Sequence, residues 1–256
     1  MKLATFNVNS IRKRAPHVRR FLERAQPDLL FLQELKCRTE EFPALEFEGS
    51  GYRLHAVGQQ GGRNGVAVLG RIPFEVVAER LPGDEADTQA RYIEVAAAGL
   101  RVAGIYLPNG NSGGEEGYAY KLGWMARLRA LAAARLDAFL PFAVLGDFNV
   151  CPTGLDLAPG ALPPTDALVR PETRAAWRAL EHLGLVDALR ALHPAERLYT
   201  YWDYGAAFER NLGLRIDHAL LSPDLAERLA AVEVDVAPRA EESPSDHTPV
   251  LVTLAA

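Results

Sequence analysis

Short apolar runs that end in polar residues are the main pattern along this chain. Residues 142–145 (FAVL) precede Gly146 and Asp147, and residues 29–32 (LLFL) precede Gln33 and Glu34. Apolar runs of this length, bounded by glycine or polar residues, indicate buried strands. The pattern therefore predicts two buried strands that each place a carboxylate at the end of a strand, where functional loops begin.

The remaining pattern predicts a chain that mixes strands and helices. We expect further strands at 2–7, 52–56, 65–70, 74–79, 91–97, 100–107, 215–221, 231–237 and 248–254. Helical spacing of apolar residues predicts helices at 16–25, 116–140, 172–183, 185–192 and 223–229. Between 52 and 107, Gly, Pro and Asp turns separate the strands, so we expect successive antiparallel pairing there.

These elements predict an α/β fold in which two packed sheets are flanked by helices. No linker-like segment divides the 256 residues, so we expect a single domain, 1–256, made of two similar halves of about 1–140 and 141–256. The apolar share of 48% is ordinary for a globular protein. A chain of this length can bury roughly 70–75% of its unfolded surface.

Several features indicate a soluble protein of the cytoplasm. No apolar run approaches the length of a membrane span, and the strand-like start at Lys2 follows no basic region or cleavage site. Cys37 and Cys151 are too few for a disulfide framework, which fits a reducing compartment. The sequence carries no signal for oligomerisation, so we expect a monomer.

The charge gives a mild argument against sequence-independent binding of nucleic acid. The formal net charge is −5, whereas such binders usually carry a basic surface. Acidic residues gathered around metal ions would remove that objection. Only four of the 28 basic residues are lysines; arginine suits bidentate phosphate contact, although genome composition produces the same bias.

The segment Asp147-Phe148-Asn149 offers two interpretations. In an extended backbone, residues two apart point to the same side, so a carboxylate and an amide would converge. Such a pair suits phosphate chemistry, because the carboxylate takes a proton from water or ligates a hard cation while the amide orients the water. The alternative is an Asx turn, and the segment alone favours that turn.

Polar residues at other predicted strand ends add to this group: Asn7, Glu34, Tyr106, Asp217, Asp246 and His247. A set of Glu, Asp and Asn without Cys/His spacing fits Mg²⁺ or Mn²⁺ rather than zinc. Asp246 and His247 are adjacent and face opposite ways if extended. We therefore expect His247 to pair with Asp217, which would fix its tautomer and favour imidazolium.

Six motifs occur in the order found in the exonuclease III family, the abasic-site DNA endonucleases within the endonuclease/exonuclease/phosphatase superfamily. They are FNVNSIR (6–12), LQELK (32–36), YLPNGN (106–111), LGDFN (145–149), NLGLRIDH (211–218) and SDHTPV (245–250). The resemblance extends from Lys2 to Leu254. NLGLRID together with YWDY (201–204) favours the DNA-repair branch over lipid phosphatases and deoxyribonuclease I-like enzymes.

The resemblance implies a four-layer αββα sandwich and a Mg²⁺-dependent enzyme in which Mn²⁺ may substitute. The implied reaction is hydrolysis of double-stranded DNA on the 5′ side of an abasic site, with 3′ to 5′ exonuclease and 3′-phosphatase activities. By position, Glu34 resembles the principal metal ligand, with Asn7 and Asp246 beside it. Asp147 resembles the residue that deprotonates the attacking water, or that ligates a second metal.

The resemblance also implies roles for the remaining catalytic residues. Asn149 would orient the water beside the second metal, and Tyr106 would contact the phosphate or assist the leaving oxygen. His247, held by Asp217, would stabilise negative charge on the phosphoryl oxygens.

We further expect DNA contacts from residues near these motifs. Phosphate contacts are expected from Lys36, Asn109, Asn211 and Arg215, and the wall of a pocket for a flipped-out, base-free sugar from Tyr201, Trp202, Leu214 and Ile216. Solvated surface is the alternative for all four phosphate contacts and is about equally favoured for the two charged residues. Ordinary core is the alternative for all four wall residues and is favoured for Ile216. Leu35, Tyr201 and Leu212 depart from residues frequent in the family, which leaves substrate preference open.

Two rival functions make different demands on the sequence. A phosphatase or RNA-directed nuclease of the same fold should lack the NLGLRID and YWDY features, and both are present. A catalytically silent nucleic-acid-binding relative should have lost one of Glu34, Asp147, Asp217 and His247, and all four are present.

Overall fold

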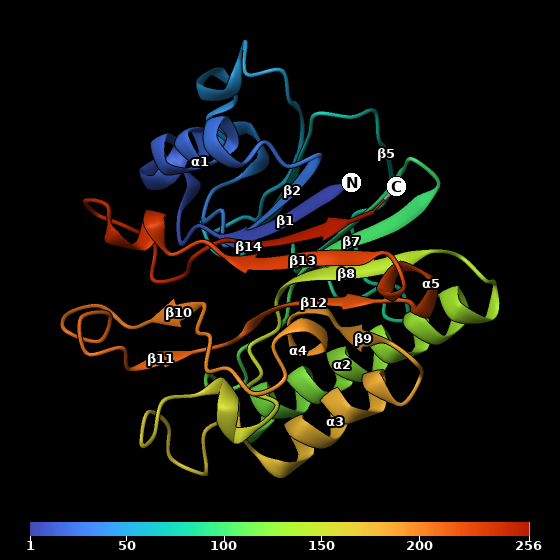
Figure 1. Ribbon diagram of the computed structural model, residues 1–256, viewed down its shortest axis with the longest axis vertical. Helices are drawn as coiled ribbons and strands as arrows, with labels where there is room; N and C mark the ends of the chain where they lie inside the picture. Colours follow the sequence, from blue (N-terminus) through green and yellow to red (C-terminus); the bar gives the residue numbers. More distant parts are fainter. Residues whose placement is uncertain (256) are drawn as a thin grey trace.

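The computed structural model describes residues 1–255, which form two six-stranded mixed sheets packed face to face between helices (Figure 1). The first sheet has the order β13 (Leu229–Val234), β14 (Val250–Leu254), β1 (Lys2–Asn7), β2 (Leu29–Gln33), β4 (Val66–Gly70) and β3 (Arg53–Val57). The second has the order β5 (Glu75–Ala78), β6 (Tyr92–Ala97), β7 (Leu100–Tyr106), β8 (Phe142–Asp147), β12 (Asp217–Leu221) and β9 (Val186–Asp187). The predicted αββα sandwich is confirmed.

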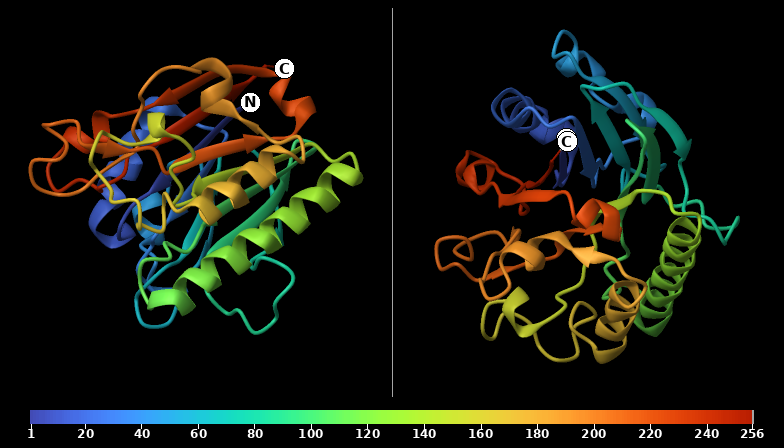
Figure 2. Two further views of the ribbon diagram at one scale, coloured as in Figure 1. Left: turned by 90° about the horizontal axis from the view of Figure 1, so that it is seen from below. Right: turned by 45° about the vertical axis from the view of Figure 1, so that its right-hand side comes forward.

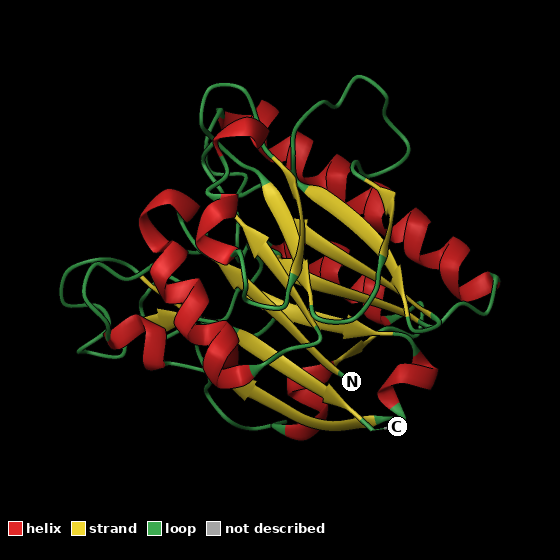
Figure 3. Cartoon of the chain, turned by 90° about the horizontal axis from the view of Figure 1, so that it is seen from above, coloured by secondary structure: helices red, strands yellow, loops and turns green. Residues whose placement is uncertain are grey.

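Helices cover the two outer faces of the stacked sheets. α1 (Ile11–Ala25) and α2 (Gly114–Asp137) lie on opposite sides of the molecule (Figure 2), and Figure 3 shows the strands between helices. The other helices are α3 (Pro171–Glu181), α4 (Ala188–Leu192), α5 (Pro223–Ala226) and the 3₁₀ turns Thr39–Glu41, Ala44–Phe47, Gly154–Asp156 and Ala237–Ala240. β10 (Tyr201–Trp202) and β11 (Gly213–Leu214) form a separate small ribbon. Within residues 1–255, no helix combines the length and apolar character needed to cross a membrane.

Side-chain alternation along the strands builds three apolar layers. In β1, Leu3 lies in the core between the sheets, whereas Ala4 and Phe6 lie in the layer beneath α1. In β8, Leu145 faces the core between the sheets and Val144 faces the α2 side. Both faces of these strands are covered, which explains their continuous apolar runs. Each sheet draws strands from both halves of the chain. The single domain of two similar halves stays a prediction.

The observed elements depart from the predicted ones in several places. α1 begins at Ile11, five residues before its predicted start, and contains Pro16. Segment 185–192 divides into β9 and α4, because the Asp187 side chain accepts hydrogen bonds from the main chain at Leu189 and Arg190 and caps the helix there. The expected run of antiparallel strands is interrupted, since β4 and β5 belong to different sheets.

The strand directions bring several strand ends together. β1 and β2 are parallel and pair Asn7 with Gln33, while β7 and β8 are parallel and pair Tyr106 with Asp147. β12 is antiparallel to β8 and pairs Asp217 with Asp147. This end lies at the left of Figure 1, opposite the two chain termini. β8 continues through Gly146 to Asp147. Gly146 has a φ of 151°, and a Cβ atom at this position would lie 2.0 Å from the main-chain oxygen of Ile105. Only glycine therefore permits the close approach of β7.

Candidate active site

Side chains from distant parts of the chain meet at this end of the sandwich. The Asn7 amide Nδ2 donates to Glu34 Oε1 and to Asp147 Oδ2, both at 2.9 Å. Asn7 and Asp147 are buried and Glu34 is mostly buried. β1, β2 and β8 therefore bring two carboxylates together around one amide.

His247 pairs with Asp217, as the sequence predicts. Its Nδ1 lies 2.8 Å from Asp217 Oδ2, and its Nε2 lies 3.7 Å from Asp147 Oδ2. Burial opposes the charged imidazole, but the carboxylates of Asp217 and Asp147 outweigh burial and raise the pKa of His247 to about 10. The imidazole therefore carries a positive charge at neutral pH.

Asp147 is the carboxyl group that is hardest to ionise in this centre. Complete burial raises its pKa to about 7, and the charges of Asp217 and Glu34 add to that effect, while the His247 imidazolium and the Asn7 amide oppose it. A carboxyl group with a pKa near the working pH is suited to accept a proton during a reaction.

The charges around Glu34 differ from those around Asp147. Burial disfavours the ionisation of Glu34. The ammonium group of Lys36, 2.8 Å from Glu34 Oε2, together with the Asn7 amide and His247, outweighs burial and lowers the pKa of Glu34. Tyr106 lies nearby, and burial together with the charges of Glu34 and Asp147 raises its pKa well above the ordinary value. Glu34 is therefore ionised at neutral pH, whereas the Tyr106 hydroxyl keeps its proton.

The donor atoms fit a hard divalent cation. One ligand atom each from Glu34, Asp147 and His247 lie within 4.8 Å of one another. Because His247 is protonated at neutral pH, the two carboxylates are the ligands that this group offers. Asn7 presents its NH₂ group to them, and its oxygen accepts from the Asn9 main chain at 3.0 Å. The Asp246 carboxyl group is held near this group through Asn9, whose side-chain amide donates to Asp246 Oδ1 at 2.9 Å.

The segment 147–149 forms the Asx turn that was the alternative interpretation. Asn149 has a φ of 50°, and its N–H donates to Asp147 Oδ1 at 2.9 Å. The expected extended backbone is therefore wrong. The turn nevertheless builds the site, since it holds one oxygen of Asp147 and leaves Oδ2 facing Asn7 and His247. The Asn149 amide donates to the Leu107 oxygen at 3.0 Å and accepts from Asn109 Nδ2 at 2.8 Å.

A cavity of about 330 Å³ opens beside these groups. It is lined by Glu34, Asn109, Asn111, Ala161, Leu162, Asp166, Leu168, Tyr201, Asp203, Leu212, Leu214, Ile216, Asp246 and His247. Tyr201, Leu214 and Ile216 thus lie where the sequence places the sugar pocket, and Ile216 does so although it is only 3% exposed.

The sequence model that describes the Endonuclease/Exonuclease/phosphatase family matches residues 4–247 of this chain. The chain belongs to this family. The family member is 35% identical to exodeoxyribonuclease III of Haemophilus influenzae over 98% of each chain. Two solved structures match it over the full length of both chains at 38% identity: a Neisseria 3′ phosphatase bound to a product DNA hairpin (TM-score 0.94) and an AP endonuclease from Archaeoglobus fulgidus (TM-score 0.93). The predicted membership of the exonuclease III family is confirmed.

Two expected DNA contacts of this family member are wrong. Trp202 packs against Tyr199 and Phe208 behind the cavity, and its Nε1 donates to Asn211 Oδ1 at 3.1 Å. Arg215 is fully buried between Asp156 (Nε to Oδ1, 2.7 Å) and Asp187.

Backbone alternation explains the position of Arg215. Leu214 and Ile216 face the cavity, so the residue between them faces the opposite way. The expected contact of Asn211 with DNA stays a prediction, as do those of Lys36 and Asn109.

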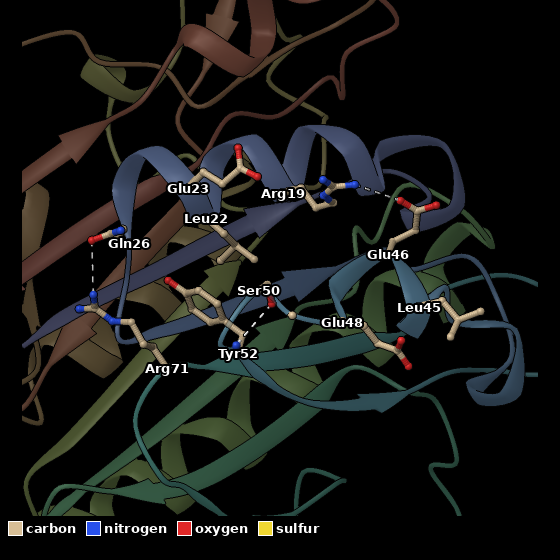
Figure 4. Close-up of a pocket in the computed structure, with 11 residues that line it drawn as sticks. Arg19, Leu22, Glu23, Gln26, Leu45, Glu46, Glu48, Ser50, Tyr52 and Arg71 are labelled. Carbon is tan, nitrogen blue, oxygen red and sulfur yellow. Dashed lines mark hydrogen bonds and ion pairs between the residues drawn. The ribbon is translucent and has the colours of Figure 1, made fainter.

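A larger cavity of about 460 Å³ lies elsewhere on this family member, between α1 and residues 45–52 (Figure 4). Some of its charged and polar side chains pair with one another: Arg19 lies 3.6 Å from Glu46, and Arg71 donates to Gln26 at 3.5 Å. It shares no lining residue with the cavity beside His247. The size of a cavity alone would therefore select the wrong place for the candidate active site.

Sequence reasoning missed several residues around the site. Leu162 and Leu168 lie in a proline-rich loop with no periodic pattern that would place them. Lys121 on α2 donates from Nζ to the main-chain oxygens of Asn109 and Asn149. A signal for Lys121 was available, because helical spacing places it on the buried face of α2 with Trp124 and other apolar residues.

Proposed function

We propose that this family member is a divalent-metal-dependent DNA-repair phosphodiesterase of the exodeoxyribonuclease III type. It would cut double-stranded DNA on the 5′ side of an abasic site and act at 3′ ends. The observation that carries the proposal is the buried arrangement of Glu34, Asp147 and His247, which combines a cation ligand, a base and a fixed positive charge. The names of its relatives support the same activity.

Mg²⁺ is the proposed cofactor, with Mn²⁺ as a substitute. Glu34 would hold it with Asn7 and Asp246 nearby. A second ion held by Asp147 and Asn149 is the alternative to the arrangement in which Asp147 is the base and Asn149 orients the water. When bound, the ion neutralises charge that develops on the phosphoryl oxygens.

The protein's own groups have complementary tasks in the proposed reaction. Asp147 takes a proton from the water whose oxygen bonds to phosphorus, while the bond from phosphorus to the 3′ oxygen of the preceding nucleotide breaks. Tyr106, which keeps its proton at neutral pH, is placed to give one to that oxygen. His247 stabilises negative charge on the phosphoryl group, and Asp217 keeps it charged and oriented.

The cavity supports the proposed preference for an abasic site. Its wall of Leu214, Ile216 and Tyr201 fits a sugar without a base, and a nucleotide without a base costs little to extrude from the helix. Lys36, Asn109 and Asn211 are the proposed phosphate contacts. We propose that the protein acts as a monomer in the cytoplasm.

A second candidate is an enzyme that acts mainly as a 3′-phosphatase. The observation in its favour is that the Neisseria 3′ phosphatase and the Archaeoglobus fulgidus AP endonuclease match the chain at the same identity, 38%.

The test uses two duplexes, one with a single tetrahydrofuran abasic analogue and one with a 3′-phosphate, each with Mg²⁺ or EDTA. We expect Mg²⁺-dependent incision of the first duplex, and loss of incision in the Asp147→Asn, His247→Ala double variant. Preferential release of phosphate from the second duplex would support the second candidate. The proposal fails if the wild type cuts neither duplex faster than the double variant does.

A further inference from the structure

Lys121 is a buried lysine beside the candidate active site. Its side chain is 0% exposed, and its Nζ donates to the main-chain oxygen of Asn149 at 2.6 Å and to that of Asn109 at 2.9 Å. Burying an ammonium group is costly unless hydrogen bonds compensate for lost water. Burial lowers the pKa of Lys121 to about 7, although the nearby carboxylates of Asp147 and Asp166 oppose this shift. The amine can donate both hydrogen bonds whether or not it carries the extra proton, so these two bonds are what hold it in place.

The two carbonyl groups belong to different loops. Asn109 lies in the loop after β7, and Asn149 lies in the turn after β8. The side chains of Asn109 and Asn149 also bond to each other at 2.8 Å. Lys121 comes from a third element, α2, so it fixes both loops to the helix that covers the second sheet.

The loop after β7 wraps closely around the lysine. Gly110 has a φ of 88°, and a Cβ at this position would lie 2.7 Å from Lys121 Cδ. Glycine is therefore required both by the left-handed backbone and by the contact with the lysine stem. The lysine and the loop conformation depend on each other.

The same turn orients the carboxyl group of Asp147. The N–H of Asn149 donates to Asp147 Oδ1 at 2.9 Å, and the main-chain oxygen of Asn149 accepts from Lys121 Nζ. On the other loop, Asn109 lines the cavity. A continuous set of hydrogen bonds thus joins the lysine to the group that takes the proton.

We propose that Lys121 is a positioning residue of this nuclease: its amino group holds the turn at Asn149 and the loop at Asn109 so that the Asp147 carboxyl group faces the reacting phosphate. This inference rests on the proposed function. Lys121 touches no reacting atom and acts through Asn149.

The test compares Lys121→Met with the wild type and with Tyr118→Phe. Methionine keeps the apolar stem but removes the charge and the donors. Tyr118→Phe is the matched control, because it removes a buried hydrogen bond of the same helix, to Thr173 at 2.9 Å, outside the two loops. Incision of the tetrahydrofuran duplex is followed at saturating and limiting DNA, and folding by thermal unfolding.

We expect kcat of Lys121→Met to fall about 10- to 100-fold, as misplacement of a reacting group by about 1 Å does, with KM changed less than about threefold. Tyr118→Phe should keep wild-type kcat. In an Asp147→Ala background, Lys121→Met should have almost no further effect, because residues that act through one group are not additive. A lysine that only braces the fold would instead multiply the loss.

The inference is overturned if the wild type cuts the duplex while Lys121→Met keeps its kcat, or if the two losses multiply. Absence of incision by the wild type would contradict the proposed function itself, which is a separate result. If Lys121→Met does not fold, Lys121→Gln, which keeps one donor, serves in the same comparison with the same expected and contrary outcomes.

Discussion

Two buried charge clusters begin two residues apart in the chain, at Arg215 and at Asp217, and they differ in how completely their charges are paired. Around Arg215, Asp156 and Asp187 each bond to the guanidinium, and Arg190 adds a second cation at Asp156. Burial opposes ionisation of both carboxyl groups, but the guanidinium outweighs it and lowers the pKa of each.

The cluster around Asp217 is left out of balance. Asp217 and Asp147 both face the single imidazolium of His247, at 2.8 Å and 3.7 Å, and Glu34 adds a third carboxylate nearby. Burial therefore raises the pKa of Asp147 to about 7 instead of lowering it. The comparison teaches that complete pairing marks a structural cluster, whereas unmet negative charge marks a centre that can take up a proton or a cation.

The largest expected effect separates activity from stability at Asp147. Asp147→Asn should lower incision activity by about 10³-fold, the scale of a lost general base. Its free energy of unfolding in EDTA at pH 8 should stay equal to that of the wild type or rise, because the substitution removes a buried charge. Incision kinetics and urea unfolding measure the two effects. A clear loss of stability in this variant would remove the distinction between the clusters.

The reverse pattern is expected at Arg215. Arg215→Met leaves two buried carboxylates without their shared partner and should lower the free energy of unfolding by about 3–5 kcal/mol. Incision by the folded protein at low temperature should fall far less than in Asp147→Asn. Arg215→Lys is the control that keeps the charge but lacks the planar group that reaches both partners. An Arg215→Met variant that is as stable as the wild type but inactive would instead favour the original prediction that Arg215 contacts DNA.

The contrast also shows what the sequence could predict. Polar residues at strand ends, together with six ordered motifs, were enough to place Glu34, Asp147 and His247 in one centre and to predict the αββα sandwich. Glu34 follows β2 and Asp147 ends β8, and each of these strands pairs in parallel with a neighbour, β2 with β1 and β8 with β7. His247 reaches the same end of the sandwich because it precedes β14, which runs antiparallel to β1. The pairing of His247 with Asp217 followed from the opposite directions of adjacent residues.

The direction of single side chains was harder to predict. Arg215 lies in a motif that resembles a DNA-binding segment, and only the orientation of Leu214 and Ile216 shows that it faces inward. The partner Asp156 comes from a loop 59 residues away, which no local pattern indicates. Asn149 lies beside Asp147 through a left-handed turn, which the segment alone favoured, and not through the extended backbone in which the two side chains would converge. The role of Asn149 stays a prediction.

The smallest expected effect is a difference in the pH dependence of stability. The folded-state pKa of Asp187 is lowered below the ordinary 3.8. Its contribution should be complete above pH 3.8 and lost as the pH falls through the folded pKa. Asp187→Asn should therefore cost about 1.5–3 kcal/mol at pH 7 and progressively less below pH 3.8.

Asp147 should show the opposite slope. The folded-state pKa of Asp147 is raised from 3.8 to about 7. Between these pH values the unfolded chain ionises this carboxyl group more readily than the folded protein does. The wild type should therefore lose stability relative to Asp147→Asn as the pH rises from 3.8 to about 7. Urea unfolding of the wild type and both variants in EDTA, from pH 3 to pH 8, measures the two differences. If both stability differences changed with pH in the same direction, folding would shift the pKa values of Asp187 and Asp147 in the same direction. The excess of carboxylates around His247 would then no longer explain why the reaction is located there.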